Sequence, residues 1–155
     1  MKAWNFEVKN NPKEISKKLK SALGPDNGFV FDMENNENNS LTFKVRKRIL
    51  FVWYMAFQNW TIVNGKLLKV NTENKTNIEI HFNQHFLMSL VIFTHIALGL
   101  GLLIAIISGI SGSGSIFILG GMILALGIIL WIAIQRKFEK DIEEYKSLIS
   151  GILEL

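Results

Sequence analysis

Residues Phe86–Ile134 read FLMSLVIFTHIALGLGLLIAIISGISGSGSIFILGGMILALGIILWIAI and contain no aspartate, glutamate, lysine or arginine. A Ser-Gly-Ser-Gly-Ser break divides this stretch into 86–110 and 116–134, and each part has the roughly 20 apolar residues that cross about 30 Å of hydrocarbon. Lipid offers no hydrogen-bond partners to a peptide backbone, and two segments cannot close a barrel, so both should be helical. The stretch predicts a transmembrane helical hairpin.

The basic residues beside the two spans predict the orientation of the hairpin. Lysine and arginine favour the cytoplasmic side of a membrane, and the loop 111–115 has neither. They flank both outer ends of the hairpin, at Lys66, Lys69, Lys75, Arg136, Lys137 and Lys140. Residues 1–27 lack the apolar core of a secretory signal. We therefore expect both termini in the cytoplasm. Richness in Asn, Lys and Ile suits an A+T-rich bacterial genome, so the expected membrane is a bacterial cytoplasmic membrane.

Composition limits the partners and the chemistry of the chain. Residues 1–85 hold 13 basic and 8 acidic side chains, and residues 135–155 hold 4 basic and 5 acidic ones. This excess is too small and scattered to suggest nucleic acid, although it helps a domain to stay near anionic lipids. The chain has no cysteine, which excludes disulfides, thiol catalysis and cysteine-ligated zinc or iron–sulfur sites.

Residues 1–85 show the patterns of a small α+β domain. Trp4, Phe6 and Val8 alternate with polar neighbours, as in a strand with one buried face. Pro12 suits the first position of a helix whose apolar stripe runs to Leu23. Further strands are expected at 29–33, 41–45, 60–63, 66–70 and 78–82. The sequence predicts a two-layer cytosolic domain made of a strand, a helix and an antiparallel meander.

One dipeptide in this domain carries a specific turn signal. Asn64-Gly65 is typical of a two-residue hairpin turn, because both residues accept positive φ. We therefore expect a hairpin whose strands are 60–63 and 66–70.

The segment Ile49–Phe57, ILFVWYMAF, is apolar without strand alternation or helical spacing. We favour a central strand that is covered on both faces. The alternative is a lipid or apolar-ligand contact, because Trp and Tyr favour the level of the lipid headgroups and basic neighbours attract phosphates. The contact residues would then be Arg46, Lys47, Arg48, Phe51, Trp53, Tyr54 and Phe57.

Small residues recur at intervals of four in both membrane segments, a spacing that lets helices approach closely. They are Ala97, Gly101, Ala105 and Gly109 in the first segment and Gly121 and Ala125 in the second. The expected contact is between the two arms of the hairpin, and a homo-oligomer is the alternative. Gly120 and Gly127 offer a second small face.

The tail, residues 135–155, shows a heptad-like seam of apolar residues. The seam consists of Phe138, Ile142, Tyr145, Ile149 and Ile152. We favour an amphipathic helix that packs on the chain's own cytosolic domain. Docking of a partner protein or a dimer zipper on these five residues is the alternative.

His95 is the only titratable group within the membrane stretch, and His81 and His85 lie just before it. His95 has no charged companion in either span, which favours a neutral ring bonded to a helix carbonyl or packed at the hairpin seam. A pair of haem ligands would require two copies of the chain. His81 and His85 are four apart, but no acid or cysteine stands in a recognised metal spacing with them. We expect no metal, no cofactor and no catalytic residues.

Three functional hypotheses follow for a chain divided into 1–85, 86–134 and 135–155. The leading one is a small membrane-anchored interaction or assembly module, with a membrane protein or a second copy as partner. The second is a protein that binds lipid or an apolar ligand through 49–57. The third is an oligomeric transporter or pore component, because a hairpin without charged pathway residues could form a pore only with other copies. None of the motif classes that mark enzymes is present, so we expect no enzyme.

Overall fold

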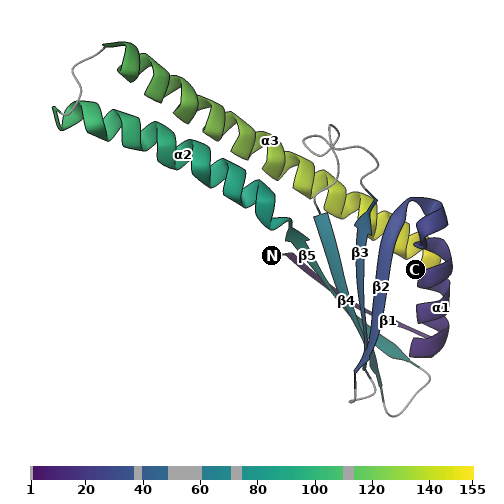
Figure 1. Cartoon of the computed structure of the whole chain (residues 1–155). Helices are drawn as coiled ribbons and strands as arrows, with labels where there is room; N and C mark the ends of the chain where they lie inside the picture. The colour runs from purple at the N-terminus through teal and green to yellow at the C-terminus, as the bar shows by residue number, and fades with distance from the viewer. Residues whose placement is uncertain (1, 37–39, 49–60, 71–74, 110–113) are drawn as a thin grey trace. The chain divides into compact units, whose positions relative to one another are not determined.

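The computed structural model describes residues 2–36, 40–48, 61–70, 75–109 and 114–155 (Figure 1). In chain order the elements are β1 (Lys2–Val8), α1 (Pro12–Ala22), the 3-10 turn η1 (Pro25–Asn27), β2 (Phe29–Asn36), β3 (Ser40–Lys47), β4 (Thr61–Lys69), β5 (Thr76–Gln84), α2 (Phe86–Ile107) and α3 (Gly114–Leu153). They form two compact units, Met1–Gln84 with Lys140–Leu155 and His85–Glu139.

The first unit is built on one antiparallel five-stranded sheet in the order β1-β5-β4-β3-β2. Strands β2 to β5 follow one another as a meander, and β1 pairs with β5 at the edge. The predicted α+β class, with a strand, a helix and a meander in that order, is therefore confirmed for this unit.

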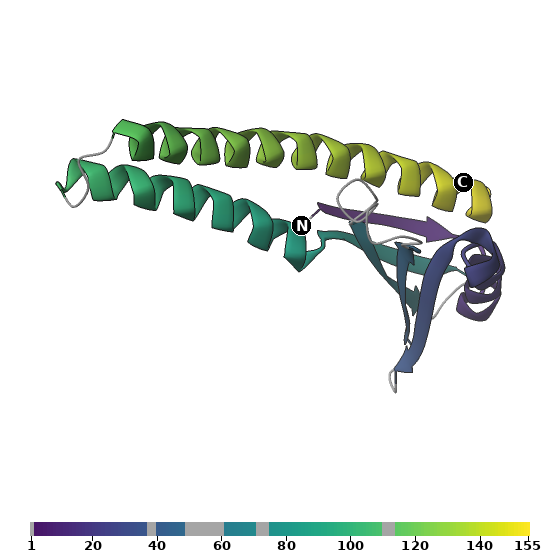
Figure 2. The same ribbon diagram turned by 45° about the horizontal axis from the view of Figure 1, so that its top comes forward.

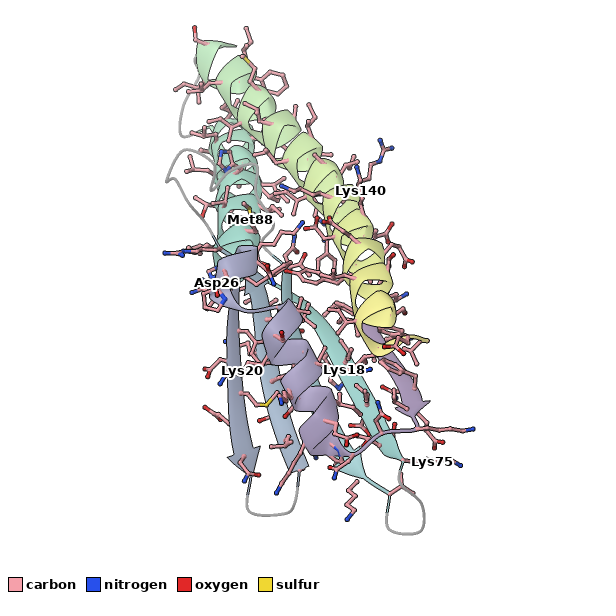
Figure 3. The ribbon with its side chains drawn as sticks, turned by 90° about the vertical axis from the view of Figure 1, so that its right-hand side faces the viewer. Lys18, Lys20, Asp26, Lys75, Met88 and Lys140 are labelled. Atoms are coloured by element: carbon pink, nitrogen blue, oxygen red, sulfur yellow. The ribbon has the colours of Figure 1, made fainter. Side chains whose placement is uncertain are left out.

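One face of the sheet is covered by α1 and by the last turns of α3 (Figure 3). Helix α1 contributes fully buried Ile15 and Leu19. Strands β3, β4 and β5 contribute alternate residues, as the two-residue period of a strand requires. The core residues of the sheet and of α3 are Val8, Phe43, Val45, Val63, Leu67, Ile78, Ile80, Phe82, Ile142, Tyr145, Ile149 and Leu153. Burial of each such side chain contributes about 1.5–3 kcal/mol, so the end of α3 is part of the core.

Local signals define the start of α1 as the sequence predicts. The Asn11 side chain accepts a hydrogen bond from the Lys13 N–H at 3.0 Å, and Pro12 occupies the first helical position. Both features satisfy or remove the free donors of a helix start. The helix therefore begins where its apolar stripe can meet the sheet.

The predicted hairpin at Asn64-Gly65 is wrong, because both residues lie in the middle of β4. Gly65 pairs with Phe43 on β3 and with Ile80 on β5. A Cβ atom at Gly65 would lie 2.0 Å from the Phe43 Cζ. The glycine is therefore needed to leave space for an aromatic ring on the covered face, and this long-range contact overrides the local turn preference.

The second unit contains the two long apolar helical stretches, side by side in Figure 2. Helix α2 has 22 residues, and the apolar part of α3 lies at the start of a single 40-residue helix. Both are long and apolar enough to cross a membrane. Their large side chains are largely exposed, with Phe93 at 70% and Ile107 at 82%. Helix α2 ends at Ile107, three residues before the predicted end of the first span.

The second predicted span and the predicted tail belong to one helix. Helix α3 runs without interruption through Ile134 and Gln135, where no glycine or proline stands to break it. What changes along α3 is the character of its surface. Before Gln135 it is apolar on all sides, and after it a single buried stripe faces the sheet.

Candidate functional site

The face of the sheet away from α1 carries polar and charged side chains from four neighbouring strands. Two rows of directly opposed residues cross this face from β2 to β5. One row is Asp32, Lys44, Asn64 and His81, and the other is Glu34, Thr42, Lys66 and Glu79. We call these residues the open-face cluster. Together with Phe43 and Gly65 they line a cavity of about 400 Å³.

The floor of this cavity is the sheet itself. The side chain of Phe43 belongs to the covered face, where it is only 3% exposed. Successive residues of a strand point to opposite faces, so Phe43 offers its main chain to the cavity. Gly65 has no side chain to offer. The longer side chains of the open-face cluster therefore form the walls.

The open-face cluster combines three carboxylates with two ammonium groups. Among the residues that the structure describes, no ion pair of 4.0 Å or less joins these groups to one another. The Thr42 hydroxyl donates to the Glu34 carbonyl at a long 3.5 Å. Opposed charges such as Lys66 and Glu79 contribute about 0.2–1 kcal/mol to a sheet even without close contact. Their heads remain available to a molecule in the cavity.

His81 lines the cavity and has an unsatisfied polar atom in its ring. Its Nδ1 is buried and has no hydrogen-bond partner in the part of the chain that is described. A buried polar atom without a partner costs about 1–3 kcal/mol. This cost is borne inside the sheet unit, because the atom is closed to solvent.

A second group of polar contacts joins α3 to the ends of β3 and β4. The Thr61 hydroxyl donates to the Asp141 carboxylate at 3.0 Å, and both residues are buried. The Lys47 N–H donates to the Tyr145 hydroxyl at 3.1 Å, and the Lys47 ammonium pairs with Glu144. Burial is the main cause that raises the pKa of Tyr145 above its ordinary value. Helix α3 thus holds both strand ends that border segment 49–60.

This arrangement uses most of the residues that we considered for partner docking. Ile142, Tyr145 and Ile149 are buried in the sheet unit, so their surfaces are occupied within the chain. Ile152 is partly exposed and lines a shallow groove with Lys17 and Lys18 of α1. Figure 3 labels Lys18, which pairs with Glu154 at 3.0 Å.

Part of the predicted lipid contact lies within the described residues. Arg46 and Arg48 are exposed, and the Arg48 N–H donates to the Gly28 carbonyl at 2.7 Å. Lys47 is engaged with Glu144. The aromatic residues Phe51, Trp53, Tyr54 and Phe57, and with them the expected central strand, lie outside the described residues.

The contact between α2 and α3 uses other small residues than those at the predicted spacing. A Cβ atom at Gly99 would lie 2.7 Å from the Leu124 backbone nitrogen, and Gly120 and Gly127 also meet the facing helix. At Gly101 and Gly121 an added Cβ would meet nothing within 4 Å. Of the remaining predicted packing residues, Ala97, Ala125 and Gly109 are exposed and Ala105 is half-buried.

The histidines of the membrane stretch have structural partners. His95 Nδ1 bonds to the Val91 carbonyl at 2.8 Å, and Gly127 faces its Cβ, so the expected bond to a helix carbonyl is confirmed. His85 caps α2, where its Nδ1 accepts a hydrogen bond from the Leu87 N–H at 3.2 Å. Within the described ranges, no three His, Asp or Glu residues are grouped to hold a metal ion.

Sequence reasoning missed the open-face cluster. Its signal is present in the polar residues that alternate with buried ones along β3 and β5. The false hairpin at Asn64-Gly65 divided β4 and so concealed that Asn64 and Lys66 share one face. No family model, curated protein sequence or solved structure matches this chain.

Proposed function

We propose that the chain is a small integral membrane protein whose spans are α2 and the apolar part of α3. The exposed apolar side chains of both helices support this proposal, because lipid solvates such side chains well and water solvates them poorly. Residues on both sides of the apolar stretch belong to the same compact unit. Both outer ends of the hairpin must then lie on one side of the membrane, and the flanking basic residues favour the cytoplasmic side.

The topology is directly testable because the chain has no cysteine. We would introduce Ser115→Cys at the exposed start of α3 and, separately, Ser147→Cys at an exposed position near its end. A thiol reagent that cannot cross membranes should label the first in intact bacterial spheroplasts and the second only after permeabilisation. Labelling of both in intact cells would contradict the topology.

For the sheet unit we propose a role as a membrane-anchored binding module. The observation that supports this role is the cavity on the uncovered face, lined by the open-face cluster from four strands. A cavity of this size falls in the range of small-molecule sites. The groups around it are suited to recognise charge and hydrogen bonds.

Native mass spectrometry of the full chain, extracted gently from its own membrane, tests the binding role. We expect a retained mass that is lost when Lys66→Glu and Glu79→Lys are combined, since this exchange keeps the opposed pair but reverses its polarity. The matched control combines Lys18→Glu with Glu154→Lys, which reverses the polarity of an ion pair away from the open face. A wild-type chain that retains nothing, or a mass equally retained by the open-face variant, would reject binding at this face.

Binding of lipid or an apolar ligand by segment 49–57 is a second candidate function. One observation favours it: Thr61, which follows the segment, pairs with Gln84, and the apolar helix α2 begins two residues later at Phe86. The segment therefore returns to the sheet at the strand end that leads into the first span. Trp53→Ser and Phe57→Ser should reduce co-purified lipid, and unchanged lipid in both variants would remove this candidate.

A further inference from the structure

We infer that the cavity of the open-face cluster binds a small zwitterion that joins a phosphate group to an ammonium group. The phosphate would lie over Lys44 and Lys66, and the ammonium group would lie against the carboxylates that flank them. This inference rests on the proposed binding role of the same cavity and names the class of ligand.

The two lysines are placed to act on one anion. Lys44 lies opposite Asn64, and Lys66 lies opposite Thr42, so the lysines occupy one diagonal of a square of four residues. Diagonal neighbours on adjacent antiparallel strands have Cβ atoms about 7 Å apart, a distance that two long side chains easily close. Their ammonium groups can therefore meet over the cavity.

The other diagonal of the square supplies neutral hydrogen-bond donors. Asn64 offers its amide, and the Thr42 hydroxyl can exchange its long 3.5 Å bond to the Glu34 carbonyl for one to the ligand; both residues line the cavity. Two ammonium groups, an amide and a hydroxyl suit the several oxygens of a phosphate group better than a single-oxygen acceptor. Lysine is a common point-charge ligand of phosphate.

Carboxylates flank this square on both outer strands. Asp32 and Glu34 stand on β2, and Glu79 stands on β5. Adjacent strands lie about 4.8 Å apart. An ammonium group two or three atoms from the phosphate therefore reaches a carboxylate while the phosphate stays on the lysines.

The balance of charge selects a zwitterion over a simple ion. The cavity walls hold three carboxylates and two ammonium groups, so an anion alone would meet flanking negative charge and a cation alone would meet the lysines. A molecule with both signs places each against its opposite. A metal ion is a poorer occupant, because the described carboxylates and histidines form no group of three ligands.

His81 adds a polar ring to the wall of the cavity. Its buried Nδ1 has no partner among the described residues, and His81 lines the same cavity beside Asn64. No other buried side-chain nitrogen or oxygen in the described ranges lacks a partner.

The test uses the full chain in nanodiscs of phosphatidylglycerol, whose headgroup has no amine. Isothermal titration with O-phosphoethanolamine should give saturable binding at least about tenfold tighter than either inorganic phosphate or ethanolamine, where tenfold corresponds to a free-energy difference of about 1.4 kcal/mol. Lys66→Gln and Glu79→Gln should each weaken binding at least about tenfold. Matched controls are Lys69→Gln on the same strand and Glu7→Gln on β1, both exposed and outside the cavity.

A second arm distinguishes a free metabolite from a lipid headgroup. In nanodiscs of phosphatidylethanolamine, a lipid-headgroup site would already be filled, so soluble phosphoethanolamine would no longer bind. A site for a free zwitterion would bind it equally in both lipids. Either result supports the inference.

Three outcomes would overturn the inference: no saturable binding, equal binding of the separate halves, or binding that the cavity variants leave unchanged. The inference and the proposed function fail separately. A mass that is retained from the native membrane and lost in the Lys66–Glu79 exchange, with no affinity for phosphoethanolamine, would keep the binding role and reject this ligand class.

Discussion

The Thr61 hydroxyl donates a hydrogen bond of 3.0 Å to the Asp141 carboxylate, inside the core that α3 forms with the sheet. The two residues are 80 positions apart in the sequence, and the entire apolar hairpin lies between them. Asp141 is only 7% exposed. The bond thus ties the first residue of β4 to the part of α3 that follows its apolar stretch.

Removing this bond should destabilise the sheet unit. In Thr61→Val a buried carboxylate loses a donor, which costs about 1–3 kcal/mol. We expect a corresponding decrease in the free energy of unfolding of the full chain in detergent, followed by circular dichroism against urea. The control Glu143→Ala removes an exposed acid two residues further along α3. This control should change the free energy of unfolding by less than about 0.5 kcal/mol. Equal effects of the two variants would show that the buried bond contributes nothing.

Gly65→Ala should be destabilising in spite of its small size. The new Cβ would lie 2.0 Å from the Phe43 Cζ, so the ring must leave its position in the core. Overpacking of this kind costs about 1–3 kcal/mol. Combining Gly65→Ala with Phe43→Leu should recover part of the lost stability, because the shorter side chain frees the space. Thermal unfolding of the single and double variants measures this recovery. Additive losses in the double variant would disprove steric conflict between these two positions.

A matched pair of alanine substitutions should distinguish glycines that contact the facing apolar helix from glycines that do not. Gly99→Ala forces a Cβ against the Leu124 backbone and should lower the thermal stability of the hairpin in detergent. Gly101→Ala meets nothing within 4 Å and should leave stability equal or slightly higher, since alanine favours a helix by about 1 kcal/mol over glycine. A larger loss at Gly101 than at Gly99 would contradict the seam described here and indicate contact with a second copy.

Alkaline pH should weaken the attachment of α3 through Tyr145. Burial raises the pKa of the Tyr145 phenol above its ordinary value of 10.0, with Asp141 and Glu144 adding to the rise and the Lys47 N–H opposing it. The unfolded chain therefore releases this proton first, so the stability that the neutral phenol contributes is complete below pH 10.0 and decreases as pH rises above it.

The pH effect is measured by comparison with Tyr145→Phe. The variant lacks the phenol proton, so its free energy of unfolding should fall less steeply between about pH 9.5 and 11, while the lysines contribute equally to both proteins. Below this range the variant should be less stable by about 1 kcal/mol, since the Lys47 N–H loses its acceptor. Parallel pH curves would show that Tyr145 does not titrate differently in the folded chain.

The sequence predicted those elements whose cause is local. Alternation at Trp4, Phe6 and Val8 marked β1, and Asn11 with Pro12 marked the start of α1. Gly65 could not be predicted, because its role depends on the Phe43 ring from another strand. At the helix seam, spacing identifies small residues, but the facing helix decides which of them are packed within the chain, here Gly99 and not Gly101.

The open-face cluster could not be recognised for the same reason. Its members come from four strands, and only the register brings Lys44 and Lys66 to one diagonal. In the sequence each is an ordinary polar residue of a strand. A site made of single residues from separate strands leaves no motif in any one segment.

The sheet unit is assembled from Met1–Gln84 and Lys140–Leu155, and this has a consequence for biosynthesis. A ribosome makes the strands first, the two apolar helices next and the covering turns of α3 last. Until Ile149 and Leu153 emerge, the apolar face of the sheet stays partly uncovered. Folding of the sheet unit is therefore completed only after both apolar stretches have been synthesised, and until then the chain carries an aggregation-prone half-domain.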